Sequence, residues 1–254
     1  MIPKIIHLCW FGNNSYPPIV EQCINSWKKV LPNFKIMVWN ENSFDIDKYP
    51  FCKTAYENKK WAFVCDYARL VVLKQYGGIY MDTDLEVIKD FSPLLINEDY
   101  ISCIFEGGLI TCGFIACSKN NPFIEKVLEY YSKHMIREDG GINYIMNPLI
   151  FTKIAIDNYN YSLKMKHFYK DGFKLFPMEF FMPYRKNLFG KDRYAHCKYV
   201  LTKNTYTIHH DLGSWGKANP FSKFIKSLMR LVLPKSFYLY SKRKHNVKVI
   251  SSIE

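Results

Sequence analysis

The sequence predicts an α/β fold built around a mainly parallel central sheet. Short apolar runs, which are typical of buried strands, alternate along the chain with longer segments of helical periodicity. The chain has 254 residues, enough for one domain with its own core. An apolar fraction of 48% is that of a folded protein, which excludes a largely disordered chain.

The first elements show this alternation clearly. Residues 3–10 and 34–39 are apolar runs that predict two buried strands. A helical pattern over residues 17–31 connects them and ends before Pro32. A polar loop over residues 40–47 follows the second strand.

The next elements lead to the most informative part of the chain. Residues 61–76 predict a helix, because this apolar-rich stretch contains neither glycine nor proline. Gly77 stands where a helix commonly ends, and a third strand then runs into Met81. Further elements are expected as strands at 100–105 and 111–117, and as a helix at 122–133 that Asn120 or Asn121 caps.

Residues 77–84 read Gly-Gly-Ile-Tyr-Met-Asp-Thr-Asp. In an extended chain Asp82 and Asp84 would point to the same side, because residues i and i+2 share a face. Two carboxylates placed in this way favour a hard divalent cation such as Mg²⁺ or Mn²⁺, which is often shared with substrate phosphates. The alternative is a solvated turn after a strand, since Asp-x-Asp alone is frequent by chance.

Two charges in the preceding helix favour the metal-site interpretation. Asp66 and Arg69 are three residues apart, so they share one face of a helix that is otherwise apolar. A structural ion pair is the alternative, but a buried pair is weak evidence for stability. The helix, the glycine turn and the carboxylate pair together indicate a polar site made from neighbouring elements.

Polar or aromatic residues follow three of the predicted strands, namely Trp10, residues 40–42 and residues 82–84. In parallel α/β folds ligands bind beyond the carboxyl ends of the strands, so these residues are expected to share one site. Its position alone favours a core residue for Trp10, because aromatic side chains at strand ends often belong to the core. His7, inside the first strand, is interpreted as a core histidine.

The charge is strongly basic and is concentrated near the end of the chain. There are 35 basic and 23 acidic residues, a formal net charge of +12, which favours an anionic partner. Residues 217–248 contain nine lysines and arginines and no acid. Within them, residues 221–233 predict a basic amphipathic helix, which either binds an anionic membrane surface or packs on the domain with its charges in water. Residues 217–254 are therefore interpreted as a basic tail on a domain of residues 1–216.

Eight cysteines are scattered along the chain without a Cys-x-x-Cys pair, so a zinc ribbon is not expected. The apolar run near the N-terminus is too short for a cleavable signal peptide, and no stretch of about 18 apolar residues could span a bilayer. A reducing, cytoplasmic setting is expected, with the tail holding the protein peripherally on the inner face of the plasma membrane.

The string AFVCDYARLVVLKQYGGIYMDTD at residues 62–84 closely resembles glycosyltransferase family 32, the DXD-containing sugar transferases. The opening PKIIHLCWFG, the segment INSWKKVLPNFKIMVWNENSF and the late IHHDLGSW at residues 208–215 are similar to parts of the same family. The resemblance spans roughly residues 1–216. It implies a GT-A fold, a single nucleotide-sugar-binding domain, and places the glucosylating domains of the large clostridial toxins among the relatives.

The resemblance also implies residue roles, position by position. Trp10 would stack on the nucleotide base, and Asn42 would lie near the nucleotide. Asp66 and Arg69 would hold the donor sugar's hydroxyls, with Arg69 also near the diphosphate. Asp82 and Asp84 would bind the cation, Asp82 also the nucleotide ribose, and His210, rather than His209, would be the late metal ligand. Ser214 and Trp215 would close over the diphosphate. The resemblance assigns no residue on the acceptor side; Glu106 is a candidate carboxylate there from its place before Gly107-Gly108 alone.

The implied activity is a retaining transfer of a hexose from a UDP- or GDP-sugar, assisted by Mn²⁺ or Mg²⁺. The resemblance favours front-face attack over a protein nucleophile. The acceptor is expected to be a glycan, in particular a lipid-linked oligosaccharide of bacterial capsule or surface-polysaccharide synthesis, which is an analogy drawn from the family.

Two other functions compete with this interpretation. A phosphatase of the haloacid-dehalogenase type also carries Asp-x-Asp after a strand, but its signature has Thr or Val where this chain has Glu86. A non-catalytic basic protein that binds a membrane or nucleic acid is the second. The absence of a nucleic-acid-binding motif and the confinement of the charge to the tail argue against nucleic acid.

Overall fold

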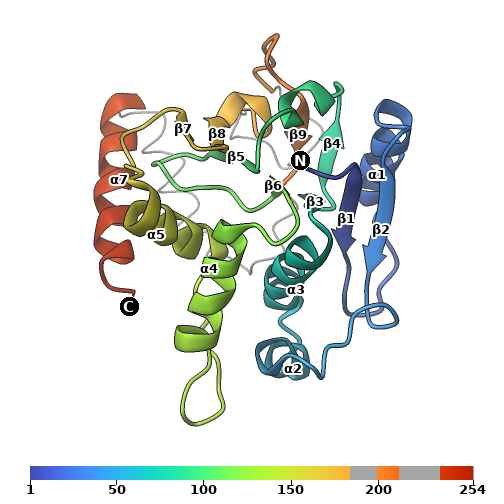
Figure 1. Cartoon of the computed structure of the whole chain (residues 1–254), viewed down its shortest axis with the longest axis vertical. Coiled ribbons are helices and arrows are strands. Elements are labelled where there is room, and N and C mark those ends of the chain that lie inside the picture. The colour runs from blue at the N-terminus through green and yellow to red at the C-terminus, as the bar shows by residue number, and fades with distance from the viewer. Residues whose placement is uncertain (184–198, 212–234, 254) are drawn as a thin grey trace, which may run out of the picture.

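The computed structural model describes residues 1–183, 199–211 and 235–253 and has the predicted α/β architecture (Figure 1). Among these residues seven strands form one central sheet. They are β1 (Ile5–Cys9), β2 (Lys35–Trp39), β3 (Gly78–Met81), β5 (Tyr100–Ile104), β6 (Phe114–Cys117), β7 (Phe168–Lys170) and β8 (Phe173–Pro177). Their order across the sheet is β2-β1-β3-β6-β5-β8-β7.

The sheet is mainly parallel, as predicted. Strands β1, β2 and β3 are parallel to one another, and β5 is parallel to β8. Strand β6 lies between β3 and β5 and is antiparallel to both, and β7 is antiparallel to β8 at the edge. The antiparallel β6 divides the sheet into two halves, so the carboxyl ends of β1 and β3 face the same edge as those of β5 and β8.

Both faces of the sheet are covered, which explains why its strands are apolar without strict alternation. On β3, Tyr80 belongs to the core on one face, while Ile79 and Met81 belong to the core on the other. The first core packs under four helices: α2 (Pro50–Glu57), α3 (Trp61–Tyr76), α4 (Pro122–Tyr130) and α5 (Asn147–Tyr159). The second packs under α1 (Pro18–Val30) and a small second sheet of β4 (Leu85–Val87) and β9 (Thr207–His209).

Local signals placed several elements correctly. Helix α3 has the predicted bounds, and it ends at Gly77, whose φ of +63° lies in the region that glycine tolerates best. Of the two proposed caps for α4 the structure selects Asn121, whose side chain accepts hydrogen bonds from the amides of Phe123 and Ile124. His7 is fully buried, as expected of a core histidine.

Other expectations were wrong or incomplete. Strand β6 begins at Phe114 rather than at residue 111, because residues 111–113 bend toward the turn of residues 82–85, named here the carboxylate turn. Helices α2 and α5 and strands β7 and β8 were not predicted. These elements depend on packing against the sheet, which the local sequence does not encode.

The C-terminal part of the tail packs on the domain. Helix α7 (Lys235–Ile250, red in Figure 1) lies beside α5, and Ile250 joins a small apolar cluster with Leu149 and Leu163. The amphipathic helix predicted over residues 221–233 lies outside the described residues. Among the helices that the structure describes, none has both the length and the apolarity needed to cross a bilayer.

Candidate active site

The two aspartates of the DXD string lie in a turn after β3, which ends at Met81 as predicted; the extended backbone from which their shared orientation was argued does not continue through them. Strand β3 ends at Met81, and the amide of Leu85 donates to the carbonyl of Asp82 at 3.0 Å, which closes the turn before β4. The turn is anchored at its start, where the amide of Asp82 donates to the carbonyl of Gly113 at 2.8 Å. The carboxylates are therefore brought together by a turn at the carboxyl end of β3, the strand end where the sequence placed residues 82–84.

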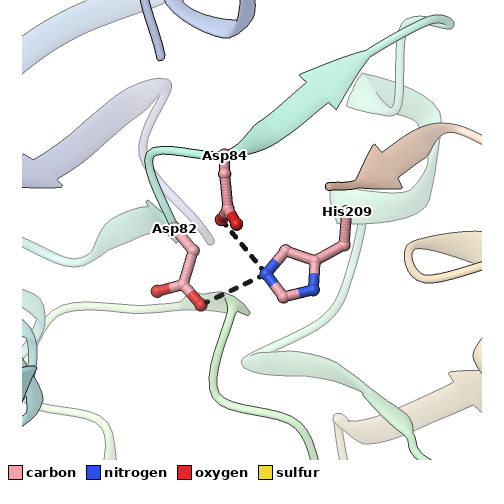
Figure 2. Close-up of side chains that lie close together, drawn as sticks. All are labelled: Asp82, Asp84 and His209. Carbon is pink, nitrogen blue, oxygen red and sulfur yellow. Dashed lines mark ion pairs between the residues drawn. The ribbon is translucent and has the colours of Figure 1, made fainter. Parts of the chain in front are cut away.

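Strand β9 brings a histidine to this turn from a distant part of the chain. Strands β4 and β9 are antiparallel, with Leu85 opposite His209, and the amide of His210 donates to the carbonyl of Asp84 at 2.9 Å. Figure 2 shows the result: the ring of His209 points between the two carboxylates. Its Nε2 lies 3.1 Å from Asp84 Oδ1 and 3.7 Å from Asp82 Oδ2.

This arrangement fits a divalent cation. One ligand atom from each of Asp82, Asp84 and His209 lies within 4.8 Å of the others, and Asp84 is 7% exposed. Two carboxylates and an imidazole form a donor set that suits Mn²⁺ and other divalent ions. The remaining positions around such an ion would be open to the oxygens of a ligand.

The structure corrects the choice between the two late histidines. His210, predicted as the metal ligand, turns away from the carboxylate pair: its Nε2 lies 2.9 Å from Glu86 Oε2, and its Nδ1 lies 3.3 Å from the hydroxyl of Tyr199. Neighbouring residues of a strand point to opposite faces, so only one histidine can face the aspartates. The register of β9 against β4 decides that it is His209.

Asp211 orients His209. Its Oδ1 lies 2.7 Å from His209 Nδ1, which leaves Nε2 as the nitrogen that faces Asp82 and Asp84. Histidines that bind metals commonly use their second nitrogen in this way. Burial disfavours a charged ring, but the hydrogen bonds with Asp211 and Asp84 raise the pKa of His209 well above its ordinary value. A cation that binds here therefore displaces a proton from Nε2.

Arg69 connects helix α3 to the carboxylate turn. Its Nη1 donates to the carbonyl of Cys112 at 2.7 Å and lies 3.5 Å from Asp82 Oδ1. Its guanidinium lies over the ring of Tyr80, 4.2 Å from the centroid, and the hydroxyl of Tyr80 donates to Asp82 Oδ1 at 2.9 Å. The planar guanidinium of arginine can stack on an aromatic ring and donate several hydrogen bonds at once, which a lysine ammonium cannot. These contacts hold the guanidinium of Arg69 in one orientation beside Asp82.

Asp66 is the partner of Arg69 on the same helix, as its spacing predicted. Its Oδ1 lies 2.9 Å from Arg69 Nη2, and the carboxyl is fully buried. Burial raises the pKa of Asp66 to about 7, even though the charge of Arg69 lowers it. Among the described residues neither carboxylate oxygen of Asp66 accepts a hydrogen bond of good geometry. The role predicted for this pair, holding the donor sugar's hydroxyls, stays a prediction.

Two predicted nucleotide-binding residues lie at the carboxyl ends of β1 and β2. Trp10 is half-buried, donates from Nε1 to the carbonyl of Asn14 at 2.7 Å, and packs edge-on against Tyr16. Asn42 is exposed in the loop after β2. Ser214 and Trp215, the predicted closing residues, lie outside the described residues. The stacking and nucleotide contacts assigned to these four residues are not tested by the structure.

Three residues near the site were not predicted: Tyr80, Gly113 and Glu41. Tyr80 could have been found, because it stands two residues before Asp82 and so on the same side of the strand. A Cβ atom on Gly113 would lie 2.7 Å from Asp82 Oδ2, a tertiary constraint with no local signal. Glu41 Oε1 accepts the amide of Gly12 at 2.6 Å and the hydroxyl of Tyr56 at 3.1 Å, which holds together the loops after β1 and β2.

Comparison with known proteins agrees with this site. Residues 17–101 match the family model described as "Glycosyltransferase sugar-binding region containing DXD motif". The region extends from helix α1 through the carboxylate turn to the start of β5, so it includes Asp66, Arg69, Asp82 and Asp84. This confirms the predicted resemblance to the DXD-containing sugar transferases of family 32.

Individual proteins with similar sequences are also named as sugar transferases. The chain is 28% identical over 134 residues to inositol phosphoceramide mannosyltransferase 3 of Schizosaccharomyces pombe. The aligned region covers 50% of this chain and 36% of that protein. The chain is 25% identical over 228 residues to the uncharacterized glycosyltransferase L373 of Acanthamoeba polyphaga mimivirus, which covers 85% of this chain and 84% of that protein. The chain thus spans about a third of the length of the mannosyltransferase.

A solved structure supports the fold. The glycosyltransferase structure "PaToxG Glycosyltransferase" superposes with a TM-score of 0.50 at 20% identity, over 63% of this chain and 70% of that one. The likeness concerns the fold alone. The α/β architecture is therefore similar to that of solved GT-A-like glycosyltransferases, and residues 17–101 carry the DXD sugar-binding region that ends beside the cluster after β3.

Proposed function

We propose that this protein transfers a hexose from UDP- or GDP-hexose to a glycan hydroxyl, with retention at the anomeric carbon. The observation that carries the proposal is the cluster of Asp82, Asp84 and His209 at the carboxyl end of β3, within a chain that carries a DXD sugar-transferase region. Such strand ends are where α/β folds bind nucleotides.

The chemistry follows from the groups at this edge. Asp82, Asp84 and His209 would hold Mn²⁺ or Mg²⁺, which supplies Lewis-acid stabilisation of the departing diphosphate. Arg69 lies beside Asp82 and adds a fixed positive charge on the same side. Tyr80 and the carbonyl of Gly113 hold Asp82 in place through hydrogen bonds. Trp10 and Asn42, at the ends of β1 and β2, would meet the nucleotide, and Ser214 and Trp215 would close over the diphosphate.

The acceptor we propose is a lipid-linked oligosaccharide of bacterial capsule or surface-polysaccharide synthesis. The relative from Schizosaccharomyces pombe is named for mannose transfer to inositol phosphoceramide, a lipid-borne acceptor. An acceptor anchored in a membrane would require the enzyme to work at a membrane surface. We therefore propose a cytoplasmic protein that is peripheral on the inner face of the plasma membrane.

The outward face of α7 supports this membrane proposal. Tyr240 and Val247 are 62% and 53% exposed, and Lys244 and Lys248 are exposed on the same face of the helix. Exposed cations beside exposed apolar side chains suit an anionic lipid surface. Co-sedimentation with vesicles of phosphatidylglycerol and phosphatidylcholine tests the idea. Replacing both lysines by glutamine should abolish binding, and binding that ignores both lipid charge and this double variant would refute it.

Nucleotide binding tests the catalytic proposal. Thermal unfolding is followed with UDP, GDP and CMP, each with and without Mn²⁺, because a ligand of the native state raises its apparent stability. We expect one nucleoside diphosphate to stabilise the protein only with Mn²⁺, and Asp84→Asn to lose that effect. Asp157→Asn, which changes a carboxylate on the outer surface of α5, is the matched control. Stabilisation by Mn²⁺ alone, with no nucleotide effect, would favour the phosphatase alternative instead.

A further inference from the structure

The inward face of α7 contacts the loop that follows β5. Lys242 Nζ lies 2.9 Å from Glu106 Oε2, and Asn246 Nδ2 donates to the carbonyl of Gly107 at 3.1 Å. Asn246 is only 5% exposed, so this hydrogen bond is made away from water. A buried carbonyl that loses its donor costs more than an exposed one, which makes the contact structurally significant.

The loop is shaped to receive the helix. Residues 105–109, which we name the β5 loop, form a tight turn in which the amide of Phe105 donates to the carbonyl of Leu109 and the amide of Gly108 donates to that of Phe105. Gly107 has φ of +80°, and a Cβ atom there would lie 2.7 Å from Asn246 Nδ2. A side chain at this position would collide with α7, so the glycine and the helix fit one another.

The β5 loop lies at the same edge of the sheet as the carboxylate turn, but in the other half. Trp10 and Asn42 follow β1 and β2 on one side of β3, whereas the β5 loop follows β5 on the far side of β6. If the proposed nucleotide lies over the first half, an acceptor that meets its sugar would lie over the second half, where the β5 loop stands. Glu106, the carboxylate interpreted as an acceptor-side group, stands in this loop.

The residues that directly follow the β5 loop in the chain contact the side chains and the turn of the site. Directly after it, the amide of Ile110 donates to Thr152 Oγ1, and the carbonyl of Cys112 accepts from Arg69. The carbonyl of Gly113 then accepts from the amide of Asp82. The loop therefore has a fixed support at its far end, on α5 and the carboxylate turn, while at its tip it is held by α7.

We propose that α7 is a positioning element for the acceptor side of the site, in which Lys242 and Asn246 hold the β5 loop in the shape that the acceptor glycan meets. The inference rests on the proposed transferase function and extends it. It assigns to the end of the chain a role in acceptor recognition that is separate from any membrane contact of the outward face.

The first test follows the loop itself by amide hydrogen exchange of the full chain. Lys242→Ala removes the contact with Glu106, and Lys153→Ala is the matched control, since Lys153 pairs with Asp157 on α5 and is equally half-buried. We expect exchange across residues 105–111 to rise at least about tenfold in Lys242→Ala and to stay unchanged in the control. Unchanged protection of the loop in both Lys242→Ala and the second variant, Asn246→Ala, would overturn the proposal.

The second test separates acceptor from donor. Transfer is measured with a panel of p-nitrophenyl hexosides as acceptor probes, and hydrolysis of the donor by water serves as the internal reference. We expect Lys242→Ala to raise the KM for the best probe about tenfold while donor hydrolysis stays within about twofold. A parallel loss of transfer and hydrolysis would mean a merely structural role and would refute the positioning of the acceptor.

The two proposals fail in distinguishable ways. If the unaltered protein binds no nucleotide and transfers no sugar, the proposed function fails, and the acceptor role of α7 fails with it. If transfer occurs but Lys242→Ala leaves both the loop exchange and the acceptor KM unchanged, only the inference about α7 fails.

Discussion

A single methyl group at Gly113 should damage the cation site without unfolding the domain. A Cβ atom there would lie 2.7 Å from Asp82 Oδ2 and 2.8 Å from Met182 Cε. Ordinary contacts begin at 3.4 Å, so the Asp82 carboxylate must move by roughly 0.7 Å and the methionine must also turn away. Asp82 is not free to move without loss, because Tyr80 and Arg69 both contact its Oδ1.

The expected loss is that of a displaced metal ligand. Disturbing the support of a ligand costs about 10- to 100-fold in metal affinity, or about 1.4 to 2.7 kcal/mol. We expect Gly113→Ala to weaken Mn²⁺ binding by this factor while its thermal unfolding midpoint falls by only a few degrees. Calorimetric titration of Mn²⁺, with and without UDP or GDP, measures the affinity.

Gly140→Ala is the matched control for this variant. It adds the same methyl group at a glycine with φ of +78° and no neighbour within 4 Å, far from any site contact. It should cost about 1 kcal/mol of stability through its backbone conformation and leave Mn²⁺ affinity unchanged. If Gly113→Ala is well folded and binds Mn²⁺ within twofold of the unaltered protein, the position assigned to Asp82 is wrong.

Four further predictions follow from the same contacts. Asp84→Asn should abolish metal-dependent transfer without unfolding the domain, and a folded variant that keeps full activity in a transfer assay would contradict the assignment. Arg69→Lys should lower transfer at least about tenfold, because lysine cannot supply the planar fork that spans Asp66 and Asp82; transfer kinetics equal to the unaltered protein would count against this role. Glu41→Gln should weaken nucleotide affinity by about threefold to tenfold, because a neutral acceptor holds the loop after β1 less tightly, and calorimetry with the nucleotide that binds would show no change if the loop is irrelevant. Burial lowers the pKa of His7 from 6.5 to about 4, so the unfolded chain takes up the proton first and stability is lost as the pH falls from about 6.5 to about 4. The full loss is about 3 kcal/mol, and urea unfolding at pH 7, 5.5 and 4 should show it as a change in the stability difference between the unaltered protein and His7→Gln. The raised pKa values of Asp66 and His209 act in the opposite direction but are common to both proteins, so they cancel in this difference; parallel curves would refute the prediction.

The neutral state of His7 has a direct structural cause. Its Nδ1 accepts from Trp39 Nε1 at 3.0 Å, and its Nε2 lies 2.7 Å from the carbonyl of Gly77, to which it donates. A protonated ring would lose the acceptor that Trp39 requires. The sequence indicated a core histidine from its place in an apolar strand, and only the packing shows which hydrogen bonds make the charged form costly.

The local sequence determined the elements whose apolar pattern extends over several residues. The helix over 61–76 and its glycine end are encoded by apolar composition, by the absence of breakers and by the conformational freedom of Gly77. Because Asp66 and Arg69 lie in that helix, their ion pair followed from spacing alone. The Asp-x-Asp spacing indicated Asp82 and Asp84 as a cation-binding pair, the family resemblance favoured the same role, and the structure brings their carboxylates together.

Contacts between distant segments decided the rest. Adjacent histidines in the sequence are equivalent until β9 pairs with β4, and the register of that pairing turns His209 toward the carboxylates and His210 toward Glu86. The carboxylate turn, the restriction at Gly113 and the hold of α7 on the β5 loop likewise depend on residues that lie far apart in the chain. Periodicity reports which face of an element is apolar, but it carries no information on which partner that face meets, and such partners are determined only when the chain has packed.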